Sequence, residues 1–370
     1  ERVVEPSEAV IEDVTRTREH MFVLDLVGGP SQIRLFDFRG TPEGLVPILP
    51  VSTVEQIVAL GPDEVLIRNE SFLQPPGWYR VSGSNVSPVK TALSKKSDVD
   101  FSGYEVVRET ATSKDGTKVP ISIIRKKGIK LDGSNPTLIW GYGGYSVSQQ
   151  PGFSEGRLLW LEQGGVFAMT HIRGGGEFGE EWHSQGNLTK KQNVFDDFHA
   201  CMMRMVELGY CTKDKLAIYG GSNGGLLMGA MIAQHPGDFK AVVSSVGIYD
   251  MLRVELSSNG AFNVTEFGTV KDEAQFKAMY AYSPYHNIKD GTAYPAVLMM
   301  TGANDPRVDP MQSRKFTARL QAAGDKMVLL RTSANSGHGV GASLNERIES
   351  DVDRYAFLFS QLGIQYKPVR

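Results

Sequence analysis

Two patterns of hydrophobic and polar positions follow each other along the chain. Up to about Lys127, apolar and polar residues alternate in short runs that turn-forming residues interrupt, as in HMFVLDLVGGPSQIRLFDFRG. Such runs are typical of antiparallel strands joined by hairpins. Charged side chains on alternating strands usually lie on the solvated face. We expect this placement for His20, Asp25, Arg34, Asp37 and Asp63.

Beyond about Lys127, strongly apolar runs alternate with segments of helical length and period. This alternation indicates an α/β fold built on a mainly parallel sheet. The expected strands lie at residues 137–140, 166–172, 215–219, 241–246, 296–301 and 327–331. The expected helices cover residues 193–208, 223–235, 273–280, 310–323 and 345–362.

Composition excludes several classes of protein. The 370 residues are 41% hydrophobic and 22% charged, which indicates a globular chain with a sizeable core. With 39 Lys and Arg against 42 Asp and Glu, no basic field attracts nucleic acid or an anionic membrane. No apolar run approaches the roughly 20 residues of a spanning helix, and the first residues do not resemble a signal peptide. We expect a soluble protein whose compartment, cytoplasmic or periplasmic, is unassigned.

Three clusters stand out among the 40 glycines, and the first resembles a dinucleotide fingerprint. Residues 174–179 read GGGEFG after a predicted strand, and Asp196 and Asp197 follow about twenty residues later. However, Glu177 and the two glutamates after it place carboxylates where a pyrophosphate needs free N–H groups. The two aspartates also lie inside a helical pattern. We therefore expect a tight turn here and no dinucleotide or other cofactor.

The second cluster, GGSNGG at residues 220–225, lies between the predicted strand LAIY and the predicted helix LLMGAMIAQHP. A G-x-S-x-G string between a strand and a helix is the context of a nucleophile elbow. The glycines allow the helix and the neighbouring strand to approach the turn. We expect Ser222 to be a nucleophile and the Asn223 N–H to be an oxyanion donor.

A serine nucleophile needs a general base and a group that orients the base. α/β-Hydrolases place them in the order serine, acid, histidine, each after a later strand. His338 follows the last predicted strand, whereas His286 comes too early. Asp305 is the first carboxylate after the strand AVLMMTG, so we prefer it to Asp309. The expected triad is Ser222, Asp305 and His338.

The third cluster, GYGGY at residues 141–145, follows the first strand of the predicted parallel sheet. In α/β-hydrolases this loop supplies the second oxyanion donor. Tyr142 could provide it through its backbone N–H or its hydroxyl. A buried aromatic turn without a catalytic role is the alternative.

Several strings together resemble one peptidase family. They are GYGGY, IRGGGEFGEEWH, KKQNVFDDF, YGGSNGGLL, YSPYHNI, NDPRV and SGHG. From about Phe72 to the C-terminus, the sequence resembles the prolyl oligopeptidase family of serine peptidases. The resemblance implies the same triad, with the Tyr142 hydroxyl and the Asn223 N–H as oxyanion hole. It also implies substrate-binding residues, namely Arg307 for a substrate carbonyl and Tyr145, Phe267 and Val308 for the pocket before the scissile bond.

The resemblance implies two domains. We expect residues 1–110 to be an all-β segment resembling the last blades of a β-propeller, and residues 111–370 to be an α/β-hydrolase peptidase domain. Two blades do not close a propeller, so the rest would come in cis or as a second chain. A propeller in this family caps the catalytic domain and restricts substrates to short peptides.

One position departs from the family pattern. Proline-specific members stack the substrate proline on a tryptophan, and the corresponding residue in GAFNVTEFG is Asn263, beside Phe262, which could take its role. The resemblance thus implies both as substrate-binding residues. An amide lacks the apolar face that a proline ring prefers. We therefore predict a serine oligopeptidase that forms an acyl-enzyme without metal or cofactor, with post-proline preference left open. The alternatives are an esterase or acyl hydrolase with the same triad, and a non-catalytic binding module.

Overall fold

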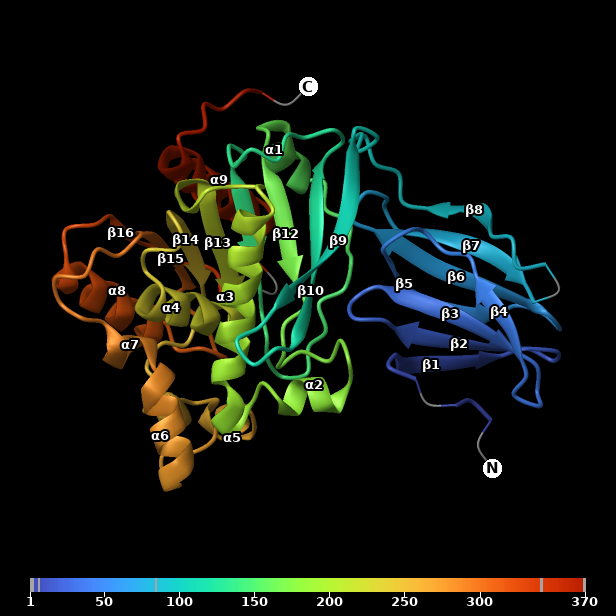
Figure 1. The fold of residues 1–370 in the computed structure, drawn as a ribbon, viewed down its shortest axis with the longest axis horizontal. Helices are drawn as coiled ribbons and strands as arrows, with labels where there is room; N and C mark the ends of the chain where they lie inside the picture. Colours follow the sequence, from blue (N-terminus) through green and yellow to red (C-terminus); the bar gives the residue numbers. More distant parts are fainter. Residues whose placement is uncertain (1–2, 6, 84, 340–341, 369–370) are drawn as a thin grey trace.

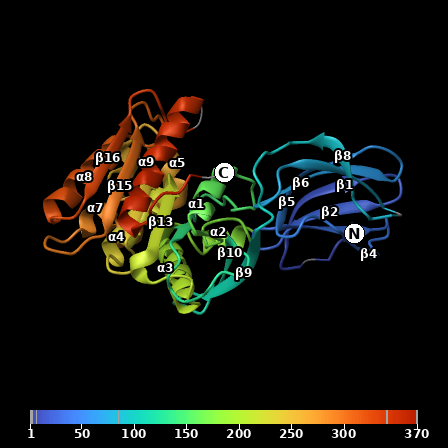
Figure 2. The ribbon, with the colours of Figure 1, turned by 90° about the horizontal axis from the view of Figure 1, so that it is seen from above.

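The computed structural model describes the chain except residues 1–2, 6, 84, 340–341 and 369–370. Two small antiparallel sheets lie beside a larger sheet that is covered by helices (Figure 1). Turned by 90°, the small sheets still stand apart from the helical part and meet it along one side (Figure 2). This arrangement confirms the predicted fold class, an α/β-hydrolase preceded by blade-like sheets.

The first blade contains strands β1 (Val10–Arg16), β2 (Met21–Leu26), β3 (Ser31–Phe36) and β4 (Pro42–Val46). The second contains β5 (Ser52–Ala59), β6 (Glu64–Ser71), β7 (Gly77–Ser82) and β8 (Val89–Ser94). Both are antiparallel meanders in chain order, and their inner faces share one apolar core that includes Phe22, Ile33 and Val65.

The expectation of a solvated face is wrong for Asp25. Its side chain is fully buried in the first blade, where Arg34 Nε donates to Asp25 Oδ2 at 2.6 Å. The neighbouring strand therefore supplies a cation that neutralises the buried carboxylate. His20 lies next to Asp63, with 2.5 Å between Nδ1 and Oδ1.

The large sheet has the order β16-β15-β14-β13-β11-β12-β10-β9. Six strands are mutually parallel, and each agrees with its predicted range to within two residues at either end: β11 (Thr137–Trp140), β12 (Val166–Thr170), β13 (Leu216–Gly221), β14 (Ala241–Ser245), β15 (Ala296–Gly302) and β16 (Val328–Ser333). β9 (Tyr104–Thr112) and β10 (Lys118–Lys126) join as an antiparallel pair. Apolar and polar residues alternate in β9 and β10 as they do in the blade strands. The local pattern alone therefore does not reveal that these two strands belong to the large sheet.

The division expected after residue 110 falls inside β9. All of β9 pairs with β10 in the large sheet, and β8 is the last strand of the second blade. We propose residues 95–103 as the connection between the two parts, since this position leaves every strand pair within one part.

Helices cover both faces of the large sheet. α3 (Gln192–Glu207), α4 (Asn223–Gln234) and α8 (Met311–Ala323) enclose one core, while α1 (Arg157–Glu162) and α9 (Leu344–Leu362) enclose the other. α9 begins where the Ser343 hydroxyl accepts from the Glu346 N–H and ends at Gly363 in the left-handed region. Among the described residues, none of the helices has the length and hydropathy needed to cross a bilayer.

The short helices α2 (Glu180–Ser184), α5 (Gly260–Phe267) and α6 (Glu273–Tyr282) lie beyond the carboxyl ends of the parallel strands (Figure 1). α7 (Pro284–Asn287) leads back to the sheet. Of these helices the sequence predicts only α6, because helices of about two turns or fewer show too little of the 3.6-residue period. These helices are placed where ligands bind in open α/β sheets.

Candidate active site

Ser222 lies in the sharp turn between β13 and α4. Its backbone has φ 59° and ψ −120°, a strained conformation for a residue with a Cβ. A Cβ at Gly220 would lie 2.4 Å from the Gly224 carbonyl oxygen, and one at Gly224 would lie 2.6 Å from the Gly141 carbonyl oxygen. The flanking glycines are therefore required for the turn to form, and the turn presents the Ser222 hydroxyl at the end of the sheet.

The structure brings the three residues of the expected triad together. Ser222 Oγ lies 2.9 Å from His338 Nε2, and His338 Nδ1 lies 2.7 Å from Asp305 Oδ2. The other oxygen of Asp305 accepts from the Arg307 and Val308 N–H groups, at 2.9 and 3.0 Å. Burial raises the pKa of Asp305, but the hydrogen bonds from His338 and these two amides outweigh it and hold the pKa below its ordinary value. The carboxylate is thus fixed in its charged form facing the imidazole.

Two loops meet at the place where an oxyanion would form. The Asn223 side chain donates to the Tyr142 carbonyl oxygen at 2.6 Å and so joins the elbow to the GYGGY loop. The Asn223 N–H is at the start of α4, where amide groups have no intrahelical acceptor. Burial raises the pKa of Tyr142, and a hydrogen bond with Ser222 offsets part of this rise. Its phenol therefore keeps its proton and can donate.

Three of the expected pocket residues form one aromatic group, and Asn263 is hydrogen-bonded to it. Tyr145 stacks on Phe262, with ring centroids 5.4 Å apart and planes 8° apart, and meets Phe267 edge-on at 5.7 Å. The Tyr145 hydroxyl donates to Asn263 Oδ1 at 2.8 Å. Phe267 and Asn263 are buried, whereas Phe262 is 59% exposed. Asn263 therefore orients Tyr145 from behind, and Phe262 is the exposed ring of the group.

A cavity touches both Ser222 and His338. It measures about 400 Å³ and extends toward β16 and α9, lined by Arg331, Glu346 and Arg354 among others. The aromatic group, Arg307 and Val308 are not part of its lining. Val308 is buried and Arg307 is exposed. The expected substrate residues therefore lie outside this cavity.

A buried ion pair supports the GYGGY loop and was not anticipated from the sequence. Lys191 Nζ donates to Glu266 Oε1 at 2.7 Å and to the Gly143 carbonyl oxygen at 2.9 Å. Both charged side chains are almost completely inaccessible, and His183 Nε2 lies 2.9 Å from the second oxygen of Glu266. Burial lowers the pKa of Lys191, and Glu266 opposes this shift. The signal in the sequence is a lysine at the start of a helix otherwise rich in apolar residues.

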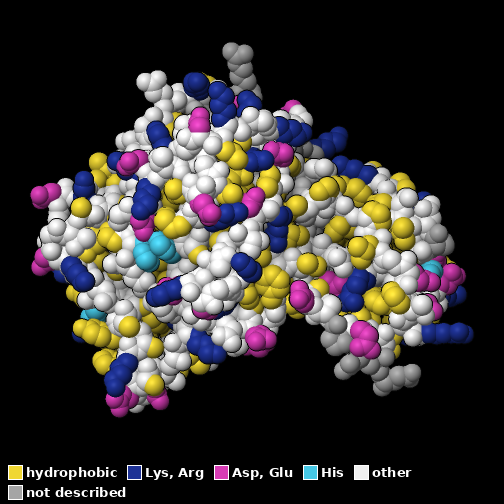
Figure 3. Space-filling model, in the orientation of Figure 1, with side chains coloured by type: hydrophobic (Ala, Val, Ile, Leu, Met, Phe, Trp, Pro, Cys, Tyr) yellow, Lys and Arg dark blue, Asp and Glu magenta, His cyan; other side chains and the backbone are white. Residues whose placement is uncertain are grey.

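Two groups of described residues that could hold a metal ion lie away from Ser222. His199, His235 and Asp238 place ligand atoms within 4.8 Å of one another near the C-terminal end of α4, about 18 Å of helix from the nucleophile. Figure 3 shows histidine side chains on the surface over α3 and α4. However, the two imidazoles stack in parallel, 3.7 Å apart, so their lone pairs do not converge, and Lys213 occupies one oxygen of Asp238. A second group is Glu19, His20 and Asp63 on the first two blades.

Asp197, one of the two aspartates that follow the fingerprint-like string, already has a partner. Asp197 is fully buried and accepts from Arg173 through both oxygens, at 2.6 and 2.9 Å. It is therefore engaged in an internal ion pair and not available to a ribose hydroxyl.

Comparisons with known proteins agree with this geometry. The sequence profile of the prolyl oligopeptidase family matches residues 151–365. A prolyl endopeptidase of Elizabethkingia miricola is 40% identical over 300 residues, which cover 80% of this chain and 42% of that protein.

Two solved structures extend the likeness to nearly the whole chain. One, from a study of two prolyl endopeptidases, has a TM-score of 0.91 and 40% identity, covering 98% of this chain and 54% of that one. The other, prolyl oligopeptidase B from Galerina marginata bound to a 35-residue substrate, has a TM-score of 0.90 and 30% identity, covering 98% and 52%. The chain thus spans about half the length of the relatives that it matches.

Proposed function

The chain belongs to the prolyl oligopeptidase family, and from this membership we propose that it acts as a serine-type oligopeptidase. The observation that carries the proposal is the continuous hydrogen-bonded series Ser222, His338, Asp305 at the strand-to-helix turn. The substrates would be short peptides cleaved at internal bonds. The names of the relatives, prolyl endopeptidase and prolyl oligopeptidase, support cleavage after proline.

The reaction would proceed through an acyl-enzyme. His338 Nε2 takes the proton of Ser222 as Oγ attacks the peptide carbonyl, while Asp305 holds the imidazole in the tautomer that accepts this proton. The Tyr142 hydroxyl and the Asn223 N–H stabilise the oxyanion. His338 then gives the proton to the leaving amine, and water releases the acyl group by the same steps in reverse order. The groups that assist these steps are side chains and a backbone amide of the chain itself.

Substrate orientation would depend on the residues around the triad. Phe262 offers an exposed aromatic face held parallel to Tyr145, which suits a proline ring without the family's tryptophan. Arg307 lies on the exposed turn after Asp305, where its side chain would bind a substrate carbonyl, as the family resemblance implies. We propose the remaining blades of the propeller in cis or as a second chain.

Turnover of matched peptide and ester substrates tests the proposal. Fluorogenic peptides with proline or alanine before the scissile bond, and an ester with the same acyl group, are compared for the wild type and Ser222→Ala. Peptide cleavage that Ser222→Ala abolishes is the expected result. Ester turnover without peptide cleavage would indicate an acyl hydrolase instead, and no turnover of either substrate would indicate a binding module. Intact mass spectrometry of the preparation shows whether a second chain is present.

A further inference from the structure

The GGGEFG segment, residues 174–179, packs against the loop that carries Tyr142 and Tyr145. The Gly174 carbonyl oxygen accepts from the Ser146 N–H at 3.0 Å, and a Cβ at Gly174 would lie 2.6 Å from the Gly143 carbonyl oxygen. Glu177 Oε1 accepts from the Gln149 N–H at 2.8 Å. The segment therefore holds residues 143–149 from behind through three separate contacts.

The opposite side of this segment contacts the first blade. The β2–β3 hairpin ends in Gly28 and Gly29, which are both buried although hairpin tips usually face solvent. The Gly28 N–H donates to the Glu177 carbonyl oxygen at 3.2 Å. A Cβ at Gly28 would lie 2.6 Å from the ring of Phe178. The hairpin tip is thus fitted against the segment with no room for a side chain.

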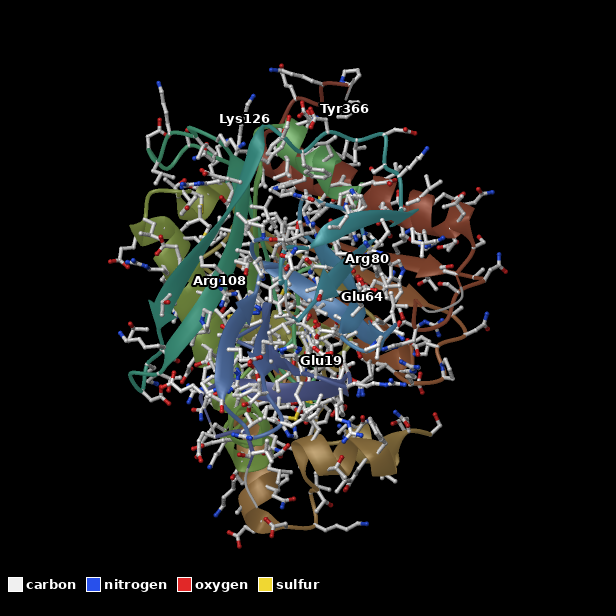
Figure 4. All side chains as sticks on the ribbon, turned by 90° about the vertical axis from the view of Figure 1, so that its right-hand side faces the viewer. Glu19, Glu64, Arg80, Arg108, Lys126 and Tyr366 are labelled. Atoms are coloured by element: carbon white, nitrogen blue, oxygen red, sulfur yellow. The ribbon has the colours of Figure 1, made fainter. Side chains whose placement is uncertain are left out.

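Two polar side chains, Arg108 on β9 and His171 directly after β12, complete this contact. Arg108 on β9 donates to the Gly28 carbonyl oxygen at 2.8 Å and to Ser122 Oγ at 3.0 Å, and it lies 3.2 Å from His171 Nε2. Figure 4 shows Arg108 on the strand beside the blades. Gly29 has φ +118°, and a Cβ there would lie 2.4 Å from the fully buried ring of His171. Both backbone polar groups of Gly28 are therefore bound by the catalytic part.

We propose that the Gly28–Gly29 turn of the first blade is a positioning element for the oxyanion loop, acting through residues 174–179 on Tyr142. The kinetic part of this inference rests on the proposed function. The turn, the segment and the oxyanion loop are stacked in direct contact, so a displacement of the turn is passed on to Gly143 and hence to the residue before it. Close-packed elements transmit such shifts because they contain no free volume to absorb them.

Two alanine substitutions on the same blade isolate the contact. Gly29→Ala introduces a Cβ at φ +118° that meets His171, whereas Gly44→Ala introduces one at φ +123° with nothing within 4 Å. Both variants carry the backbone strain, and only the first disturbs the docked turn. We expect kcat/KM of Gly29→Ala to be about 10- to 100-fold below that of Gly44→Ala, through kcat more than KM, since a displacement of about 1 Å in a catalytic group has effects of this size.

Hydrogen exchange of the full chain gives a readout that does not need activity. The Ser146 N–H should exchange faster in Gly29→Ala than in Gly44→Ala. Equal exchange and equal kcat/KM in the two variants would overturn the inference. If the wild type proves inactive, the proposed function fails, and the exchange rates alone decide this inference.

A second pair of variants leaves the glycines unchanged and guards against misfolding of Gly29→Ala. Arg108→Met removes the donor to Gly28, while Arg80→Met changes an exposed arginine of the second blade that lies 3.8 Å from Glu64 (Figure 4). Faster exchange at Ser146 and lower kcat in Arg108→Met but not in Arg80→Met would support the positioning role. Wild-type behaviour of Arg108→Met would contradict it.

Discussion

Replacing Lys191 by methionine tests whether the buried ion pair supports the GYGGY loop. The substitution keeps most of the side-chain volume and removes the ammonium that donates to Glu266 at 2.7 Å and to the Gly143 carbonyl oxygen at 2.9 Å. Glu266 then stays buried with His183 as its remaining partner. Breaking a buried pair in this way typically costs about 3–5 kcal/mol of stability.

A double-mutant cycle separates the cost of leaving Glu266 unpaired from the interaction free energy between Lys191 and Glu266. In Lys191→Met/Glu266→Gln no carboxylate is left uncompensated, so the double variant should be more stable than Lys191→Met alone. Each variant is unfolded in urea and followed by tryptophan fluorescence and circular dichroism. Lys277→Met is the control. It breaks the exposed ion pair with Glu273 and should leave the urea concentration at the unfolding midpoint almost unchanged. Strictly additive effects of the two single substitutions would refute the coupling between Lys191 and Glu266.

Three further predictions concern the oxyanion hole, a buried carboxyl and the pocket. Tyr142→Phe should lower kcat by about 10²- to 10³-fold at unchanged circular dichroism, and an unchanged kcat would remove its hydroxyl from the oxyanion hole. Burial raises the pKa of Glu177 to about 8, from an ordinary value of 4.5 that the unfolded chain should keep. Below pH 4.5 the carboxyl is protonated in both the folded and the unfolded chain, and its contribution to the free energy of unfolding is fully present. Between pH 4.5 and 8 the unfolded chain loses this proton first, so the free energy of unfolding falls by about 1.4 kcal/mol per pH unit. The free energy of unfolding in urea, measured at several pH values, should fall between pH 5 and 8 in the wild type relative to Glu177→Gln. Parallel plots of this free energy against pH for the two proteins would contradict the shift. Phe262→Ala should lower the ratio of kcat/KM for proline over alanine substrates, whereas Phe276→Ala on α6 should not; equal ratios would exclude Phe262 from the pocket.

The sheet was largely predictable because its signals are local. Each parallel strand is a short apolar run, and the five long helices show a clear period, so their ranges agree with the structure to within a few residues. The membership of β9 and β10 was not predictable in this way. Their alternation resembles that of blade strands, and only the pairing of β10 with β12 assigns them to the large sheet.

The triad could be proposed from strand order because each of its members follows a different strand of one parallel sheet, and such strand ends meet at one edge. Asp305 and His338 are separated by 33 positions, yet their side chains are hydrogen-bonded. The supporting contacts gave no comparable signal. The pairing of Lys191 with Glu266 and the docking of Gly28 against residues 174–179 depend on tertiary packing between distant segments. Asn263 is an expected pocket residue, and in the structure it is buried and accepts a hydrogen bond from the Tyr145 hydroxyl, a contact that no spacing rule encodes.

Labelling with a fluorophosphonate tests the central claim, that Ser222 is a nucleophile activated by His338, most directly. The reagent attaches to an activated serine, and mass spectrometry of a digest identifies the residue that carries it. We predict one phosphonylated site at Ser222, no labelling in Ser222→Ala, and strongly slowed labelling in His338→Ala. Labelling that persists in Ser222→Ala, or proceeds at the wild-type rate in His338→Ala, would contradict the account.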